Sequence, residues 1–391
     1  MYPLILSAAR TPIGKFLGGL SELPAPRLGA VAVAEAVRRA NVPPDRVAEV
    51  ILGTVVQAGQ GQAPARQAAL FGGLPDTVPA VTVNKVCGSG LKAVMLAAQA
   101  IKAGDADVVV AGGMESMSRA PYLLKGARTG FKYGDQTATD SLVLDGLWCP
   151  FENRPMGDSA EYTAGTCGIT RPDQDRFAAR SHRRAAAAWE RGDFAAEVVP
   201  VTVPGGRAPV TVAKDEGIRP DTTAEGLAKL RPAFQTDGTV TAGNASQLSD
   251  GAAALVVASP AAAGAIGTAP LARIIAYATS GVAPKDIFVA PVPAVRMVLE
   301  KAGLRLQDID LFELNEAFAA QMLACGKELG LDEERVNVNG GAIALGHPIG
   351  ASGARVLTTL VYALRARGLR YGLASLCLGG GNAVAMVVER I

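Results

Sequence analysis

Cys87 lies in a setting that suits a nucleophile. Val81 and Val83 alternate with polar neighbours as in a strand that enters a turn, and apolar residues recur at helical spacing through 91–101. Gly88 and Gly90 permit a sharp turn between the two segments. Cys87 therefore precedes a predicted helix N-terminus, where unpaired N–H groups favour an anion, and we expect this position to lower the pKa of its thiol. The alternative is a small buried hydrophobe, the usual role of a free cysteine.

Three further polar side chains lie at predicted strand ends or glycine-rich turns. His347 stands among the glycines of 340–353, a flexible setting that suits a base better than a core histidine. Cys377 precedes the glycines of 379–381, whose free N–H groups can stabilise an oxyanion; a buried strand-end cysteine is the alternative. Asn315 follows a short predicted strand, and capping of the next helix is its alternative role.

Together these side chains indicate covalent acyl-type chemistry. A thiolate nucleophile needs a base such as His347, and a second thiol, Cys377, can move a proton at a reacting carbon. The residues alone do not identify the substrate. The other histidine, His182, lies among arginines on the predicted charged helix 173–191, so we expect it on the surface. We expect Cys325 in the core, because it shares a helix face with apolar residues.

The composition excludes several functional classes. A length of 391 residues predicts two or three domains, and 49% hydrophobic with 19% charged residues indicates well-buried cores. The net charge of +2 indicates neither nucleic acid nor a membrane as a partner. Two histidines and five cysteines without CxxC spacing argue against a bound metal and a disulfide framework, and favour a reducing, cytoplasmic location. No run approaches the roughly 18 apolar residues of a membrane helix.

The elements that position these residues follow a duplicated pattern. Alternating strand and helix periodicities predict an α/β fold. Residues 37–50 match 299–312 at an offset of 262, whereas the closing strands 251–257 and 382–388 match at an offset of 131. The same Ser-Gly dipeptide also precedes a helix in each copy, at 89–90 and 352–353. Because the offsets differ by 131, we predict an insertion of about that length in the first copy.

The duplication divides the chain into three predicted domains. The first half comprises 1–113 plus 250–268, the second comprises 269–391, and the insertion is 114–249. A long insertion on a rigid α/β base commonly shapes a binding site; a lid or an oligomer arm is the alternative.

Local patterns predict the structure of the insertion. The spacings Asp158 to Glu161 and Thr170 to Asp173 predict two helix capping boxes. Residues 198–213 read as a β-hairpin whose turn includes Gly206.

The chain strongly resembles the thiolase family. Four motifs in family order carry the resemblance, at 84–90, 315–318, 346–350 and 377–381, and it extends over essentially all 391 residues. It implies a thiolase-like α/β fold, in which two duplicated halves pack as five αβαβα layers with an inserted loop domain. It also implies a homotetramer or dimer.

The resemblance assigns roles to matching residues. Cys87 is implied as the nucleophile that forms an acyl-thioester, and His347 as the base that activates it. Cys377 would remove the α-proton of a second acetyl-CoA. Asn315 would hold a water that forms one oxyanion hole with His347, and the N–H groups of Cys87 and Gly379 would form the other. The implied reaction is ping-pong acyl transfer, either condensation of two acetyl-CoA to acetoacetyl-CoA plus CoA or thiolysis of a 3-ketoacyl-CoA.

The resemblance also implies that coenzyme A binds as a substrate against the insertion, with no permanently bound cofactor. The implied contacts are Met156, Arg219, Phe234, Ser246, Leu248, Ala317 and Phe318. The guanidinium of Arg219 suits a CoA phosphate. Pro155 stands before Met156-Gly157, as in degradative 3-ketoacyl-CoA thiolases, where short-chain biosynthetic members have His. Acyl-chain length and direction therefore stay open.

Two other functions fit parts of the pattern. A ketoacyl-synthase-type condensing enzyme shares the fold, but such enzymes use His or Asn where this chain has Cys377. A non-catalytic acyl-CoA-binding or lipid-binding thiolase-like protein is the other alternative, and the presence of both cysteines argues against it. In each case we expect small-molecule acyl-CoA partners.

Overall fold

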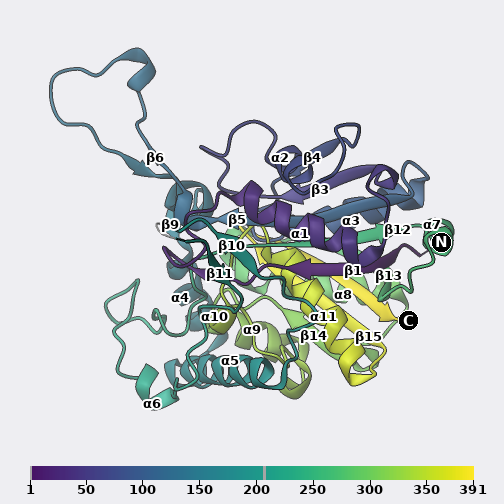
Figure 1. Cartoon of the computed structure of the whole chain (residues 1–391). Helices are drawn as coiled ribbons and strands as arrows, with labels where there is room; N and C mark the ends of the chain where they lie inside the picture. Colours follow the sequence, from purple (N-terminus) through teal and green to yellow (C-terminus); the bar gives the residue numbers. More distant parts are fainter. Residues whose placement is uncertain (1, 206–207) are drawn as a thin grey trace.

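The computed structural model describes residues 2–205 and 208–391, and strands and helices alternate along it as predicted (Figure 1). No helix in this described part is long and apolar enough to cross a membrane. The first set of elements is β1 (Leu4–Arg10), β2 (Gly14–Lys15), α1 (Ala25–Ala40), β3 (Glu49–Gly53), α2 (Pro64–Phe71), β4 (Ala80–Val83), α3 (Ser89–Ala103) and β5 (Val108–Ser116), completed much later by β12 (Ser249–Ala258) and α7 (Pro260–Ile266).

The second set repeats the first. It comprises β13 (Ala272–Gly281), α8 (Pro291–Ala302), β14 (Leu311–Leu314), α9 (Ala319–Leu329), α10 (Ala342–Leu345), α11 (Ser352–Arg367), β15 (Tyr371–Leu378) and β16 (Asn382–Arg390). The strand order β3-β5-β12-β1 in the first half-sheet corresponds to β14-β15-β16-β13 in the second, and the parallel and antiparallel pairings are the same. The first half-sheet has one further strand, β4, parallel to β3. A parallel bridge from Phe312 to Val336 stands where β4 would lie. The predicted duplication is therefore visible in the sheet.

Helices and the two half-sheets form five layers. The half-sheets join through only two residue pairs of β1 and β13. One apolar core contains α3 and α11 together with the facing sides of both half-sheets. A second core packs α1 and α2 on the outer side of the first half-sheet, and a third packs α8 and α9 on the outer side of the second. This layering fits the predicted five-layer α/β architecture.

The two central helices approach closely near their N-termini. A Cβ on Gly90 would lie 2.7 Å from the backbone nitrogen of Ala354, and a Cβ on Gly353 would lie 2.3 Å from that of Leu91. Only glycine fits at such distances. The two Ser-Gly dipeptides therefore allow α3 and α11 to bring together the turns that precede them, one with Cys87 and the other with His347.

The excursion between β5 and β12 contains small sheets and two longer helices. Its elements are β6 (Tyr122–Leu123), β7 (Thr139–Asp140), β8 (Trp148–Cys149), β9 (Arg154–Pro155), α4 (Met156–Cys167), α5 (Arg171–Arg191), β10 (Val201–Val203), β11 (Val210–Val212) and α6 (Ala224–Leu227). The loop between β6 and β7 projects from the body of the molecule (Figure 1). β10 and β11 form the predicted hairpin, whose Gly206 lies outside the described residues.

One of the two predicted capping boxes is correct. Thr170 and Asp173 cap α5 reciprocally. The other prediction is wrong, because α4 begins at Met156, so Asp158 lies inside its first turn. The carboxylate of Glu161 instead accepts hydrogen bonds from the backbone N–H groups of residues 239 and 240, at 2.8 Å each. Glu161 thus ties α4 to the chain that returns toward β12.

Candidate active site

The turn that carries Cys87 is held by its own side chains. Val86 has a φ of 48°, in the left-handed region that a β-branched residue rarely adopts. Asn84 Oδ1 accepts from the N–H of Val86 at 3.0 Å, and Ser89 Oγ accepts from the N–H of Lys85 at 2.8 Å. Ser89 Oγ also donates to the carbonyl of Val86. These bonds fix the half-buried Cys87 two residues before α3.

The surroundings of Cys87 keep its thiol protonated. Desolvation disfavours the thiolate and raises the pKa of Cys87 to about 12, and the nearby backbone N–H groups of Cys87 and Gly379 oppose this effect only in part. The expected lowering of the pKa at a helix start is therefore wrong, because desolvation outweighs the N–H groups. Gly88 contributes to the proximity of Gly379: a Cβ on Gly88 would lie 2.3 Å from Leu378 Cδ2, so a larger residue would displace the buried Leu378 side chain between the two turns.

His347 is a buried, neutral imidazole. Its Nδ1 lies 2.6 Å from Ser352 Oγ, which also lies 2.9 Å from the carbonyl of Pro348. Because a carbonyl can only accept, we assign the hydroxyl proton to that bond and the Nδ1–H tautomer to His347. Burial, with a smaller effect of Arg355, lowers the pKa of His347 to about 3. Nε2 therefore has a free lone pair that can accept a proton.

Asn315 lies on the Nε2 side of that ring. Its Nδ2 is 3.4 Å from His347 Nε2, and its backbone N–H continues the sheet by donating to Ser375. Capping does not explain Asn315, because α9 begins only at Ala319. Its buried Oδ1 has no hydrogen-bond partner among the described residues. Such an unpartnered acceptor can bind a water, which is what the predicted oxyanion hole requires.

One carboxyl group and one hydroxyl group that the sequence analysis did not identify hold the His347 loop in place. Glu115, at the end of β5, accepts from the N–H of Gly350 at 2.9 Å and from those of Val55 and Val56. Ser249 Oγ accepts from the N–H of His347 at 3.2 Å. An acid near the end of an otherwise apolar strand was the available signal for Glu115, whereas nothing in the sequence distinguishes Ser249 from other serines.

Cys377 lies at the end of β15 in an apolar environment. Burial raises the pKa of its thiol well above the usual range, and the neighbouring Cys87 and Cys325 raise it further. The residues packed with it include three of the predicted CoA contacts: Met156, Ala317 and Phe318, together with Ala160, Val240, Ala245, Ile287 and Phe288. Cys325 is fully buried as expected, in the neighbouring core.

Most of the predicted CoA contacts adjoin one another. The N–H of Ser246 donates to the carbonyl of Ala317 at 3.0 Å. The rings of Phe234 and Phe318 meet edge to face, with centroids 6.4 Å apart. Leu248 packs in the same cluster as Cys87. These residues therefore connect the surroundings of the two cysteines.

Arg219 does not take part in these contacts, and its side chain is exposed. Its backbone N–H donates to Nδ1 of His182 at 3.1 Å. The expectation of a surface position for His182 is wrong: only 2% of the residue is exposed. The charged pattern of α5 gave the wrong prediction because Ser181 and His182 lie on the side of the helix that contacts the backbone of residues 219 and 341. Burial, then Arg219, lowers the pKa of His182 to about 4.

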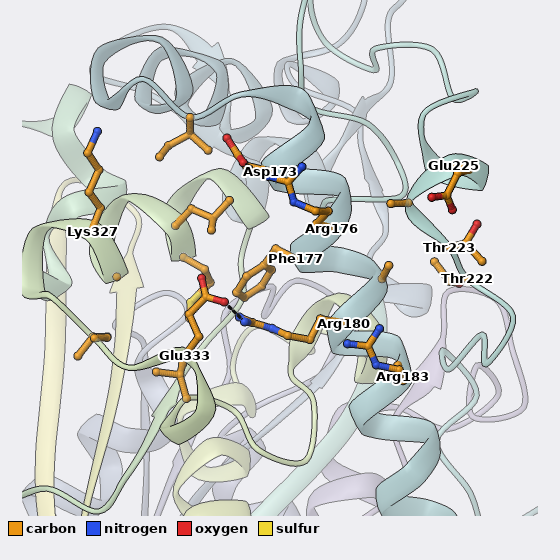
Figure 2. A pocket seen from close by; sticks show the side chains of 18 of the residues that line it. Asp173, Arg176, Phe177, Arg180, Arg183, Thr222, Thr223, Glu225, Lys327 and Glu333 are labelled. Carbon is orange, nitrogen blue, oxygen red and sulfur yellow. Dashed lines mark hydrogen bonds and ion pairs between the residues drawn. The ribbon is translucent and has the colours of Figure 1, made fainter.

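A separate hollow of about 1100 Å³ lies between α5, α9 and the segment 220–225. Figure 2 shows Arg176, Arg180 and Arg183 along α5, with Arg180 paired to Glu333 across the hollow. None of the predicted site residues lines it. The candidate active site is therefore the junction of the Cys87, Asn315, His347 and Cys377 segments.

The fold and this junction define a thiolase-type protein, and comparison with known families agrees. Residues 4–261 match the family model "Thiolase, N-terminal domain", and residues 268–390 match "Thiolase, C-terminal domain". The chain belongs to the thiolase family.

Named relatives cover the chain almost completely. It is 56% identical over 389 residues to an acetyl-CoA acetyltransferase of Escherichia coli, and 54% identical over 388 residues to one of Cupriavidus necator, each covering 99% of both chains. A probable acetyl-CoA acyltransferase of Staphylococcus epidermidis is 51% identical and covers 99% of this chain and 98% of its own. The crystal structure of the Bacillus anthracis acetyl-CoA acetyltransferase superposes with a TM-score of 0.98 at 47% identity, covering 100% and 99%. The predicted thiolase-like fold is confirmed.

Proposed function

We propose that this protein is a thiolase that joins two acetyl-CoA into acetoacetyl-CoA and CoA, and cleaves 3-ketoacyl-CoA in reverse. The observation that carries the proposal is that Gly379 packs against the turn of Cys87, where a Cβ on Gly379 would lie 3.1 Å from Val86 Cγ1, so that the N–H groups of Cys87 and Gly379 are both near the Cys87 sulfur. Donors in that position can stabilise the oxyanion of a thioester under attack. The names of the relatives, acetyl-CoA acetyltransferases at more than 50% identity, support the same reaction.

The first half-reaction acylates Cys87. The thiol attacks the thioester carbonyl, and its proton passes to Nε2 of His347, because a thiol with a pKa of about 12 needs a base at that moment. The oxyanion receives hydrogen bonds from Cys87 N–H and Gly379 N–H. When it collapses, the CoA thiolate leaves and takes the proton of Cys377. The products are an acyl-thioester, an imidazolium and a Cys377 thiolate.

The second half-reaction forms the carbon–carbon bond. The Cys377 thiolate removes an α-proton from the second acetyl-CoA; its high pKa suits this weak carbon acid. The enolate oxygen receives hydrogen bonds from the His347 imidazolium and the water on Asn315. The enolate carbon attacks the acyl-thioester, and the departing Cys87 sulfur recovers its proton from His347. All groups then have their starting protons.

The side chains around Cys377 favour a short acyl group. Phe288 and Phe318 meet at 5.2 Å between ring centroids, and Ile287 packs beside them. This filled apolar space leaves little room for a long acyl chain. Pro155 points the other way, because it resembles the residue of degradative 3-ketoacyl-CoA thiolases. Rates of thiolysis across 3-ketoacyl-CoA chain lengths decide between them: we expect the highest kcat/KM with acetoacetyl-CoA.

The remaining features of the proposal follow from family membership. We infer the three domains 1–113 plus 250–268, 114–249 and 269–391, a homotetramer or dimer, and a cytoplasmic location. We also infer CoA thioesters as substrates and no permanently bound cofactor. Of the seven proposed CoA contacts, Arg219 would pair with a phosphate from its exposed position.

Mass analysis of peptides after incubation with acetyl-CoA tests the function. We expect one acetyl group on Cys87. Cys87→Ala should carry none, and the matched Cys167→Ser, which removes a cysteine outside the junction, should label like the parent. An absence of acetyl on Cys87 in folded protein would refute the proposed mechanism.

A further inference from the structure

A buried pair of an acid and an arginine, Glu313 and Arg355, lies directly behind Asn315 and Ser352, the two groups that contact the ring of His347. Leu311 faces the central helices, whereas Phe312 and Leu314 face the outer layer, so Glu313 and Asn315 share the side toward α11. On α11, Arg355 lies one turn after Ser352, on the same helix face. The strand that positions Asn315 and the helix that positions Ser352 are therefore joined by Glu313 and Arg355.

The pair is buried and incompletely satisfied. Arg355 Nη1 lies 3.6 Å from Glu313 Oε2, and each side chain is 2% exposed. No hydrogen bond reaches either carboxylate oxygen or any of the three guanidinium nitrogens from the described residues. Replacing such a pair by apolar side chains often leaves stability unchanged or increases it. Stability is therefore a weak reason for keeping this pair.

The first copy of the fold provides an internal comparison. Glu313 pairs in register with Ala374, which pairs with Met386; at the same place in the first half-sheet Ile51 pairs with Ala111 and then with Leu255. Ile51 is a buried core residue. The duplicated architecture thus accepts an apolar side chain where Glu313 stands, and the copy with the acid is the one that carries His347.

We propose that Glu313 and Arg355 are positioning residues, which clamp β14 to α11 so that Asn315 and His347 keep the spacing of their oxyanion hole. The inference rests on the proposed thiolase function and adds two residues to it. Asn315 is reached through Glu313, two positions earlier, and His347 through Ser352, one turn before Arg355. A change of about 1 Å in such a constellation costs about 100-fold in rate.

Other charges near the pair enter any pH effect. Burial raises the pKa of Glu313 to about 8 and lowers the pKa of Arg355. Glu197, Glu316 and Arg367 also act on Glu313, and Glu197, Glu316 and Arg10 also act on Arg355. Because the cation of Arg355 disfavours an imidazolium at His347, its removal should raise the pKa of His347. The same substitution thus loosens the geometry and changes the base.

The decisive variant is the double substitution Glu313→Ile with Arg355→Met, which copies the apolar position of the first half. We expect a melting temperature equal to or above that of the parent, kcat about 100-fold lower, and KM for acetoacetyl-CoA within threefold of the parent. The matched control is Lys92→Met, which removes the cation at the position on α3 equivalent to Arg355 and should leave kcat unchanged.

Several outcomes separate positioning from a structural role. Unchanged kcat in the folded double variant overturns the proposal. A fall in kcat that is fully explained by a smaller fraction of folded protein also overturns it. Arg355→Lys is the second variant, for use if the double variant does not fold. It keeps the cation but replaces the guanidinium that reaches Glu313 by a shorter, flexible side chain, so we expect kcat about tenfold below the parent. Parental kcat overturns the proposal.

Alkylation of Cys87 by iodoacetamide gives a readout that needs no thiolase turnover. We expect a slower reaction in the double variant and a dependence on pH displaced upward, because His347 assists the loss of the thiol proton. A parent that alkylates but is never acetylated refutes the proposed function alone. Identical alkylation profiles in parent and variant refute the positioning role.

Discussion

Replacing Ser352 with alanine removes the group that sets the tautomer of His347. Ser352 Oγ accepts from Nδ1–H at 2.6 Å in a fully buried position. Without it, that N–H has no acceptor, or the proton moves to Nε2, where it faces the amide nitrogen of Asn315 at 3.4 Å. Either arrangement leaves a buried donor unsatisfied, which costs about 2 kcal/mol.

That cost fixes the expected kinetic effect. About 2 kcal/mol corresponds to roughly a 30-fold loss in kcat at 25 °C, with KM for acetoacetyl-CoA nearly unchanged, because Nε2 acts on the reacting groups rather than on CoA. Steady-state thiolysis, followed by the loss of the 3-ketothioester absorbance, measures both constants. Thermal unfolding should change by only a few degrees.

The control for Ser352→Ala is Ser141→Ala, which removes another fully buried hydroxyl that has no hydrogen-bond partner in the described part of the chain. We expect parental kinetics there. Full kcat in folded Ser352→Ala would refute the assigned tautomer, and with it the role of Nε2 as the base.

Three further variants test other parts of the site. Cys377→Ser should acetylate Cys87 yet lose condensation by more than 100-fold, since a serine hydroxyl is a far weaker acid than a thiol; mass analysis and condensation assays that fail together would contradict its assigned role. Gly88→Ala puts a Cβ 2.3 Å from Leu378 Cδ2, so urea unfolding should show a loss of about 1–3 kcal/mol, and parental stability would contradict the close approach of the two turns. Desolvation raises the pKa of Glu115 from 4.5 to about 7, so the folded protein holds the extra proton and stability falls as pH rises between these values, by about 3 kcal/mol from this group. Glu115→Gln should lose that part of the slope in urea titrations at pH 5 and pH 7.5, and an unchanged slope would rule out Glu115 as its source.

Periodicity and motif spacing predicted the α/β alternation, the duplication and the segments that meet at the site. These signals are local or repeat along the chain, so they can be recognised in the sequence alone. The pKa of Cys87 was mispredicted because desolvation depends on distant chain, which a helix start does not reveal. His182 was misassigned because the packing of 217–219 on α5 decides its burial. Ser352 and Glu115 acquire roles only when α11 and β5 meet the His347 loop.

The duplication explains why these parts meet. α3 and α11 are equivalent helices that touch at Gly90 and Gly353, so the turns before them face one another across the pseudosymmetric contact. One turn carries the thiol and the other carries the imidazole, which no single copy could provide. The symmetry does not extend to the strands next to these turns, because Ile51 on β3 corresponds to Glu313 on β14. A fold that accepts apolar packing at this position has here a buried acid and a guanidinium beside the base, and chemistry at His347 accounts for that difference better than stability does.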